Sequence, residues 1–182
     1  MKILVFGAGV IGSVYAARLY EANCAVTLLA RGTRFEKLKQ NGVILKNVLT
    51  EKQTIYYVPL VRQLAPADFY DLIIVAVRLD QLDSAISILK KNTACPLIML
   101  MLNNPGDLMG LTNELAQKHL ILGFPGAGGA HTDNRVDYIQ IKQQKTTIGE
   151  IDGKKSREES CKAGGAGSGA GRQKSARLKN QL

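Results

Sequence analysis

A glycine-rich turn near the N-terminus limits the folds that this chain can adopt. Residues 2–6 are a short apolar run that ends at the turn, and residues 11–21 then carry apolar side chains at helical spacing. Strand, glycine turn and helix in this order are typical of a domain that binds a dinucleotide. The first glycine permits the bend, the second lets the backbone approach a pyrophosphate, and the third lets the helix pack closely. The predicted turn residues are Gly7, Ala8, Gly9, Val10, Ile11 and Gly12.

The start of the helix after this turn also favours an anion, because its first N–H groups have no partner within the helix and its dipole is positive there. The alternative interpretation is a strand–turn–helix unit that needs its glycines only for backbone geometry. The order of the following elements favours the dinucleotide-binding interpretation.

Strand and helix signals alternate along the chain. The expected strands cover residues 2–6, 25–30, 72–77, 96–102 and 120–124, and the expected helices cover residues 11–21, 81–90 and 108–118. This alternation predicts an α/β fold of the Rossmann type, doubly wound, with a mostly parallel sheet. Residues 42–59 alternate apolar and polar side chains and suggest a small antiparallel excursion. Residues 135–150 predict a hairpin around a polar turn at 142–144, which gives the sheet an antiparallel edge.

Charge and composition divide the chain in two. The 182 residues have a formal net charge of +9, but residues 154–182 hold eight basic and two acidic residues and so carry +6 of it. The same segment has no Val, Ile, Phe, Tyr or Trp and contains a run of glycine and alanine at 163–171. We therefore expect a dinucleotide-binding domain over residues 1–153 and a disordered basic tail over 154–182.

Other features exclude several classes of protein. No apolar run approaches the roughly 20 residues that span a bilayer, so we expect no membrane insertion and a cytoplasmic location. The three cysteines form no CxxC pair, and His119 and His131 are isolated, so we expect neither a disulfide framework nor a metal site. The sequence argues against nucleic acid as a partner, because the basic glycine-rich tail offers no aromatic stacking surface. We expect Gly126 to Gly129 to form a flexible connection and neither histidine to have an acidic partner.

The residue at the end of the second strand predicts the nucleotide. An acidic residue about 20 positions after the glycines would accept hydrogen bonds from the ribose of NAD. Here Arg31 stands nineteen positions after Gly12, and Arg34 adds a second cation nearby. Arginine forms paired, charge-assisted hydrogen bonds with a phosphate, so the sequence favours NADP. The alternative is that Arg31 is a solvated residue at a strand end.

Four stretches carry a family pattern when they are taken together. They are KILVFGAGVIGSVYAARL at the N-terminus, LLARG after the second strand, VAVRLDQL after a later strand, and MLMLNNPGD. In this combination residues 1–153 resemble the N-terminal domain of ketopantoate reductase (2-dehydropantoate 2-reductase). The third stretch is similar to that family's V-K-x-x-Q, and the fourth to its L-x-N-G-x-G.

The resemblance implies NADPH-dependent reduction of a 2-keto acid, 2-dehydropantoate, to pantoate in pantothenate biosynthesis. It implies that Val77, Arg78, Gln81 and Asn104 join the turn and Arg31 in binding the cofactor, with Arg78 and Asn104 next to the nicotinamide and substrate. Arg78 replaces the usual lysine, and Pro105 replaces a glycine after Asn104, with Asn103 as the alternative alignment for this asparagine. Alternatively, Arg78 is an exposed pair with Asp80 at a helix start, and Asn104 belongs to a plain turn.

The resemblance ends near residue 157. In the family a lysine and a glutamate on a helical C-terminal domain supply the proton, and that domain is absent here, so we assign no catalytic residue. We expect an inactive, truncated cofactor-binding half that arises from a frameshift, and a domain fragment or a naturally short protein are the alternatives. A non-catalytic NADP-binding or sensing module is the second functional hypothesis. Exposed apolar surface left by a missing domain would favour a homo-oligomer.

Overall fold

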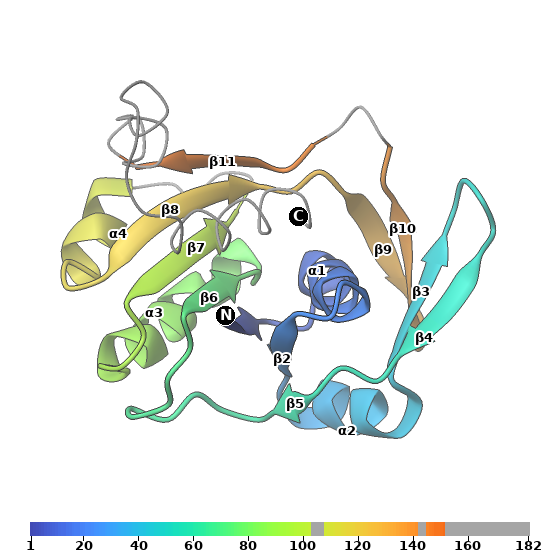
Figure 1. Ribbon diagram of the computed structural model, residues 1–182, viewed down its shortest axis with the longest axis horizontal. Helices are drawn as coiled ribbons and strands as arrows, with labels where there is room; N and C mark the ends of the chain where they lie inside the picture. The colour runs from blue at the N-terminus through green and yellow to red at the C-terminus, as the bar shows by residue number, and fades with distance from the viewer. Residues whose placement is uncertain (103–107, 142–144, 152–182) are drawn as a thin grey trace, which may run out of the picture.

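A central sheet of seven strands forms the core of the part of the chain that the computed structural model describes, which is residues 1–102, 108–141 and 145–151 (Figure 1). The predicted tail at 154–182, Asn104 and the turn at 142–144 lie outside these residues. The strand order is β11-β8-β7-β6-β1-β2-β5. The strands are β1 (Lys2–Phe6), β2 (Ala25–Leu29), β5 (Leu60–Val61), β6 (Leu72–Val75), β7 (Leu97–Met101), β8 (His119–Phe124) and β11 (Thr147–Glu150).

The pairing within this sheet confirms the predicted doubly wound fold. Every neighbouring pair is parallel except β11 with β8, where Ile148 lies opposite Gly123 in an antiparallel edge. The chain winds from β1 through β2 to β5 on one side, and from β6 through β7 to β8 on the other. The strand order therefore reverses between β1 and β6. In open α/β sheets, ligands bind outside the carboxyl ends of the strands at such a reversal.

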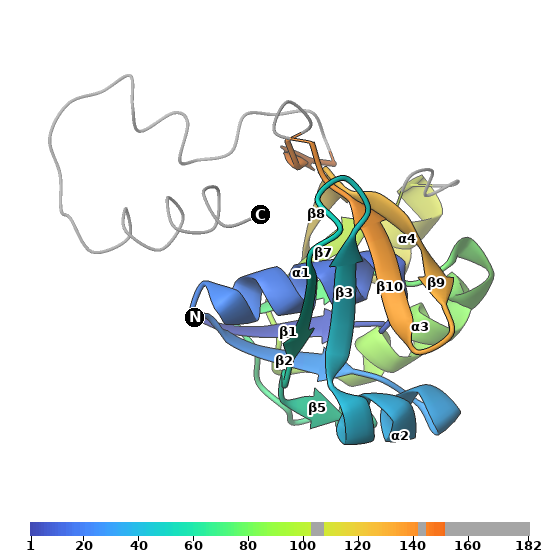
Figure 2. The ribbon, with the colours of Figure 1, turned by 90° about the vertical axis from the view of Figure 1, so that its right-hand side faces the viewer.

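A second sheet covers the helix that follows the glycine turn. Its order is β4-β3-β10-β9, with β3 (Val43–Asn47), β4 (Gln53–Tyr56), β9 (Gly128–Thr132) and β10 (Arg135–Ile139). Helix α1 (Val10–Glu21) contacts β1 and β2 on one side and all four of these strands on the other (Figures 1 and 2). A helix between two sheets is buried around most of its circumference, which explains the run of buried residues from Gly12 to Ala17.

Polar side chains hold the second sheet against α1. The Arg18 guanidinium donates hydrogen bonds to the Tyr138 hydroxyl on β10 and to the Tyr56 hydroxyl on β4, the latter at 3.5 Å. The Tyr56 hydroxyl in turn donates to the Glu21 carboxylate at 3.0 Å. At the other end of the second sheet, the Gly126 amide donates to the Tyr15 hydroxyl at 3.0 Å. These contacts join the middle and the last turn of α1 to the second sheet and to the residues that precede it.

The remaining helices are α2 (Gly32–Asn41), α3 (Leu82–Lys91), α4 (Leu108–Glu114) and a short 3-10 turn, η1 (Leu79–Gln81). The sequence pattern did not reveal α2, because its buried residues are limited to Phe35 and Leu38. In α3 the apolar residues recur at helical spacing, and four of them are buried. No helix in the described ranges has the length and apolar character needed to span a bilayer.

Two predictions about residues 126–150 are wrong. The strands expected to form one hairpin exist as β10 and β11, but they belong to different sheets. Val136 and Tyr138 of β10 are buried in the core around α1, and β10 pairs with β3, so burial outweighs the local turn signal.

The expected flexible connection is partly the strand β9, which starts at Gly128. A Cβ on Gly129 would lie 2.2 Å from the Asp137 carbonyl oxygen, so this glycine permits close strand pairing. The antiparallel excursion at 42–59 is confirmed as β3 and β4.

Candidate nucleotide-binding site

The glycine turn lies at the reversal in strand order, directly after the carboxyl end of β1. Gly7 has a φ of +113°, and a Cβ there would lie 2.7 Å from the Ala76 carbonyl oxygen after β6. A Cβ on Gly12 would lie 1.9 Å from the Gly7 carbonyl oxygen. Backbone conformation and backbone contact therefore require glycine at both positions, as predicted for the bend and for close helix packing.

Gly9 differs from these two glycines. It is exposed and precedes α1 with a φ of −73° and a ψ of −168°, a conformation that any residue adopts. A Cβ on Gly9 would meet only the Ala76 carbonyl oxygen, at an ordinary contact distance of 3.8 Å. Neither the backbone nor the described neighbours require glycine here. What glycine provides at this position is open space over the backbone, and this is where a pyrophosphate approaches in a dinucleotide-binding turn.

The first turn of α1 fits an anion in its charge and its hydrogen bonding. The first helical hydrogen bond within it runs from the Ser13 amide to the Gly9 carbonyl oxygen at 2.9 Å. The helical pattern therefore leaves the amides of Val10, Ile11 and Gly12 without helical acceptors. Gly9 supplies no capping side chain, and the first turn has no acidic residue. This helix start can hold a negative charge with its backbone alone.

Arg31 lies at the same edge of the sheet. It follows β2, which pairs in parallel with β1, and the Gly7 amide donates to the Leu29 carbonyl oxygen at 3.2 Å. Arg31 is the residue before α2, and its side chain is exposed. The next residue, Gly32, has a φ of +54°, and no atom of the described residues lies within 4 Å of a Cβ added to it. An exposed cation and an open helix start thus stand beside the glycine turn, although selection of NADP by Arg31 stays a prediction.

Arg34 points toward the turn. Its Nε donates to the Ala8 carbonyl oxygen at 3.1 Å, and its Nη2 donates to the Ser13 hydroxyl at 3.3 Å. Burial lowers the pKa of Arg34 from its ordinary value. The sequence indicated a cation at this position but gave no sign that it contacts Ala8 and Ser13, because α2 itself was not predicted.

The third predicted group follows β6. Val77 is half-buried, and its Cγ1 would lie 2.9 Å from a Cβ on Gly7. The Arg78 side chain is 79% exposed and forms two hydrogen bonds with the Asp80 carboxylate, at 2.9 and 3.0 Å. The Gln81 side-chain oxygen accepts the Arg78 amide at 3.5 Å. The structure therefore contains the exposed pair of Arg78 and Asp80 at a helix start. A contact between Arg78 and a ligand stays a prediction.

The two histidines differ in their relation to this cluster, because His119 is bonded elsewhere and His131 is influenced by the Arg34 charge. The His119 Nε2 lies 2.8 Å from the Glu150 Oε2 across β8 and β11, so the expectation that His119 has no acidic partner is wrong. That expectation failed because β11 pairs with β8 and not with β10. His131 is on β9, and burial together with the Arg34 charge lowers its pKa. Within the described residues, no group of three or more His, Cys, Asp or Glu side chains is arranged to hold a metal ion.

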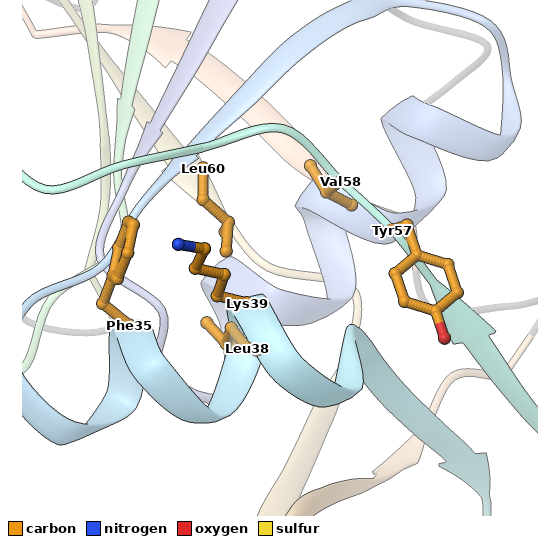
Figure 3. Close-up of a pocket in the computed structure, with 6 residues that line it drawn as sticks. All are labelled: Phe35, Leu38, Lys39, Tyr57, Val58 and Leu60. Carbon is orange, nitrogen blue, oxygen red and sulfur yellow. The ribbon is translucent and has the colours of Figure 1, made fainter.

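A separate groove of about 300 Å³ lies between α2 and the segment that joins β4 to β5 (Figure 3). Its lining is mostly apolar, with the Lys39 amine between the Phe35 ring and Leu60. None of the predicted site residues lines it. The full lining is Phe35, Leu38, Lys39, Tyr57, Val58 and Leu60.

Comparison with known proteins gives a family match and several structural neighbours. A family model described as ketopantoate reductase PanE/ApbA matches residues 3–153. The uncharacterized oxidoreductase YkpB of Bacillus subtilis (strain 168) is 32% identical over 90 residues, which are 50% of this chain and 29% of YkpB.

The solved structures share the fold at low identity. A "Probable 2-dehydropantoate 2-reductase panE" from Bacillus subtilis superimposes with a TM-score of 0.69 at 18% identity, over 86% of this chain and 52% of that one. D-mandelate dehydrogenase, in a ternary structure with NADH and anilino(oxo)acetate, gives 0.68 at 19% identity, over 90% and 52%. The chain thus spans about half the length of these solved relatives.

Proposed function

Because the chain belongs to the ketopantoate reductase family, we propose that its described part is the NADP(H)-binding half of a reductase that converts 2-dehydropantoate to pantoate. The single observation that carries the nucleotide site is Gly9, whose space is open although neither its φ nor a protein contact requires glycine. The nucleotide pyrophosphate would lie over Gly9, against the amides that begin α1. When bound, the nicotinamide supplies the hydride.

This chain's own residues would bind and orient the cofactor. The turn holds the pyrophosphate, Arg31 holds the ribose 2′-phosphate, and Val77 and Arg78 line the approach to the reacting end. Reduction of a ketone also needs a positioned proton donor. The resemblance places this donor on a helical domain, and the match with each solved relative covers only 52% of that relative's chain. We therefore propose that residues 1–151 bind the cofactor without reducing the keto acid.

Titration with NADPH tests the proposal directly. The chain has no tryptophan, so the emission of the reduced nicotinamide can be followed without overlap from tryptophan emission. We expect saturable binding of NADPH and weaker binding of NADH. Absence of binding by both nucleotides would sink the cofactor proposal. Consumption of NADPH on addition of 2-dehydropantoate would instead overturn the proposal that the described half does not reduce it.

Replacement of Arg31 by alanine is expected to weaken NADPH binding by about tenfold or more, because hydrogen bonds to a charged group contribute about 1.5–3 kcal/mol. NADH binding should change little, since NADH has no 2′-phosphate. The measurement is the ratio of the two dissociation constants. Lys37→Ala removes an exposed cation from α2, the helix that follows Arg31, and is the control for net charge. Equal losses for NADPH and NADH in Arg31→Ala would refute the role of Arg31 in selection.

Replacement of Asp80 by asparagine is expected to strengthen NADPH binding by about two- to threefold. Exposed ion pairs are worth about 0–1 kcal/mol, so Asp80 competes only weakly with an anionic ligand for Arg78. Asp83→Asn removes an exposed carboxylate from the next turn and controls for charge alone. Titration with NADPH should show tighter binding by Asp80→Asn than by Asp83→Asn. An equal gain in both would show that the pairing of Arg78 with Asp80 plays no part.

A further inference from the structure

The Ala8 carbonyl within the glycine turn is held by two side chains. The Arg34 Nε donates to it at 3.1 Å from α2, and the Ser13 hydroxyl donates to it at 3.4 Å from α1. Arg34 also donates from Nη2 to the Ser13 hydroxyl at 3.3 Å, and the Ser13 side chain is fully buried. The three groups form a closed set of hydrogen bonds that joins the first turns of both helices to the glycine turn.

The direction of this carbonyl determines the direction of an amide. Ala8 C=O and Gly9 N–H belong to one peptide unit, and in a planar trans peptide the two bonds point in opposite directions. The chain has no cis peptide among the described residues. A side chain that fixes the Ala8 carbonyl on the α2 side of the turn therefore turns the Gly9 N–H to the opposite side. Without a Cβ, Gly9 has no side chain to restrict the rotation of this peptide unit.

We propose that Arg34 is a positioning residue for the nucleotide-binding turn, which orients the Gly9 amide through its hydrogen bond to the Ala8 carbonyl. This inference rests on the proposed function, since the oriented amide serves a bound pyrophosphate. It gives the two neighbouring arginines different roles. Arg31 is exposed and meets the ligand, whereas Arg34 is half-buried and uses two of its nitrogen atoms on the protein.

The contacts of Arg34 support this division. Its Nε and Nη2 are committed to a backbone carbonyl and a buried hydroxyl, which are neutral acceptors inside the fold. The loss of solvent around the guanidinium lowers its pKa, although an arginine stays protonated at neutral pH. A lysine would keep the charge but lacks the planar fork that reaches two acceptors at once.

The test uses the full chain with Arg34→Met, Arg34→Lys and the control Arg62→Met. Arg62 is also an arginine beside α2, but it is paired with Glu36 and stacked on Phe35 away from the turn. We expect Arg34→Met to weaken NADPH and NADH equally, by about fivefold, because the pyrophosphate is common to both. Arg34→Lys should not restore binding, and Arg62→Met should leave both dissociation constants unchanged.

Amide hydrogen exchange in the nucleotide-free protein supplies a second readout. The Gly7 and Ser13 amides, bonded at the two ends of the turn, should exchange faster in Arg34→Met, while the amides of β6 keep their rates. A loss confined to NADPH would mean direct contact with the 2′-phosphate and would overturn the proposal. Unchanged exchange at the turn would overturn it as well.

A second variant and the exchange measurement cover the cases in which Arg34→Met does not fold or the unmodified chain binds no nucleotide. If Arg34→Met does not fold, Ser13→Ala removes the second acceptor and leaves the arginine in place. Ser13→Ala should weaken the binding of both nucleotides, by less than Arg34→Met does. Unchanged affinity for both nucleotides would contradict the proposal. If the unmodified chain binds neither nucleotide, the proposed function fails, while faster exchange at Gly7 in the variant still establishes that Arg34 holds the turn.

Discussion

Replacement of Gly12 by alanine is expected to destabilise the folded chain by about 3 kcal/mol or more, because the new methyl group would clash with backbone atoms of Gly7. The added Cβ would lie 1.9 Å from the Gly7 carbonyl oxygen and 3.0 Å from its carbonyl carbon. Relief requires a shift of α1 away from β1. Helix α1 is packed between two sheets and tied to β4 and β10 through Arg18, so such a shift would disturb both.

Urea and thermal unfolding of the nucleotide-free protein measure this effect. Gly149→Ala is the matched control, because Gly149 lies in β11 and no atom of the described part of the chain lies within 4 Å of a Cβ added there. We expect that control to stay within about 0.5 kcal/mol of the unmodified protein, as for surface substitutions. Equal stability of Gly12→Ala and Gly149→Ala would show that the close approach of α1 to β1 is not needed.

The main sheet and its first helix could be predicted because their signals are local and strong. Residues 3–6 are apolar without interruption, as expected for a buried parallel strand, and the glycines after them mark the turn. Once the strands alternate with helices, the handedness of the crossovers leaves few possible topologies. The place of Arg31 beside the glycine turn follows from this order, because β1 and β2 are neighbours and both end at the same edge.

The β3–β4 pair of the second sheet could be predicted, but the pairing of β3 with β10 could not, because it is not local. Residues 43–47 and 135–139 form neighbouring parallel strands, although about 90 residues separate them in the sequence. Each strand looks ordinary alone, and the need to cover α1 decides which strands pair. Helix α2 was missed for a related reason. Its surface is mostly polar, and its two buried residues give too short a pattern to separate it from a loop.

The same limit applies within the site. The glycine pattern and Arg31 follow a known spacing, so their positions could be read from the sequence. The contact of Arg34 with Ala8 could not, since it depends on the orientation of α2 and on a hydroxyl buried in α1. Similarly, the Arg78 guanidinium could pair with the Asp80 carboxylate or contact a ligand, and the sequence alone does not decide between these two interactions.

Replacement of Gly9 by alanine is expected to weaken both NADPH and NADH by about tenfold to a hundredfold while the fold stays intact. Among the described residues, the added Cβ meets no atom beyond its chain neighbours closer than 3.8 Å, so the loss of stability should be limited to the roughly 1 kcal/mol that separates glycine from alanine before a helix. The methyl group would occupy the space over the turn where the pyrophosphate is proposed to lie. Loss of one or two hydrogen bonds to a charged group gives a reduction of this size.

Two measurements on Gly9→Ala separate a ligand role from a structural role. Nucleotide titration should show the loss for NADPH and NADH alike, and urea unfolding without nucleotide should place the variant near the unmodified protein. Gly12→Ala should show the opposite pattern, with stability lost in the absence of any ligand. If Gly9→Ala bound both nucleotides normally, the pyrophosphate could not lie over Gly9. The open space at this residue would then be a property of the turn alone, and the nucleotide site would have to be sought elsewhere at the sheet edge.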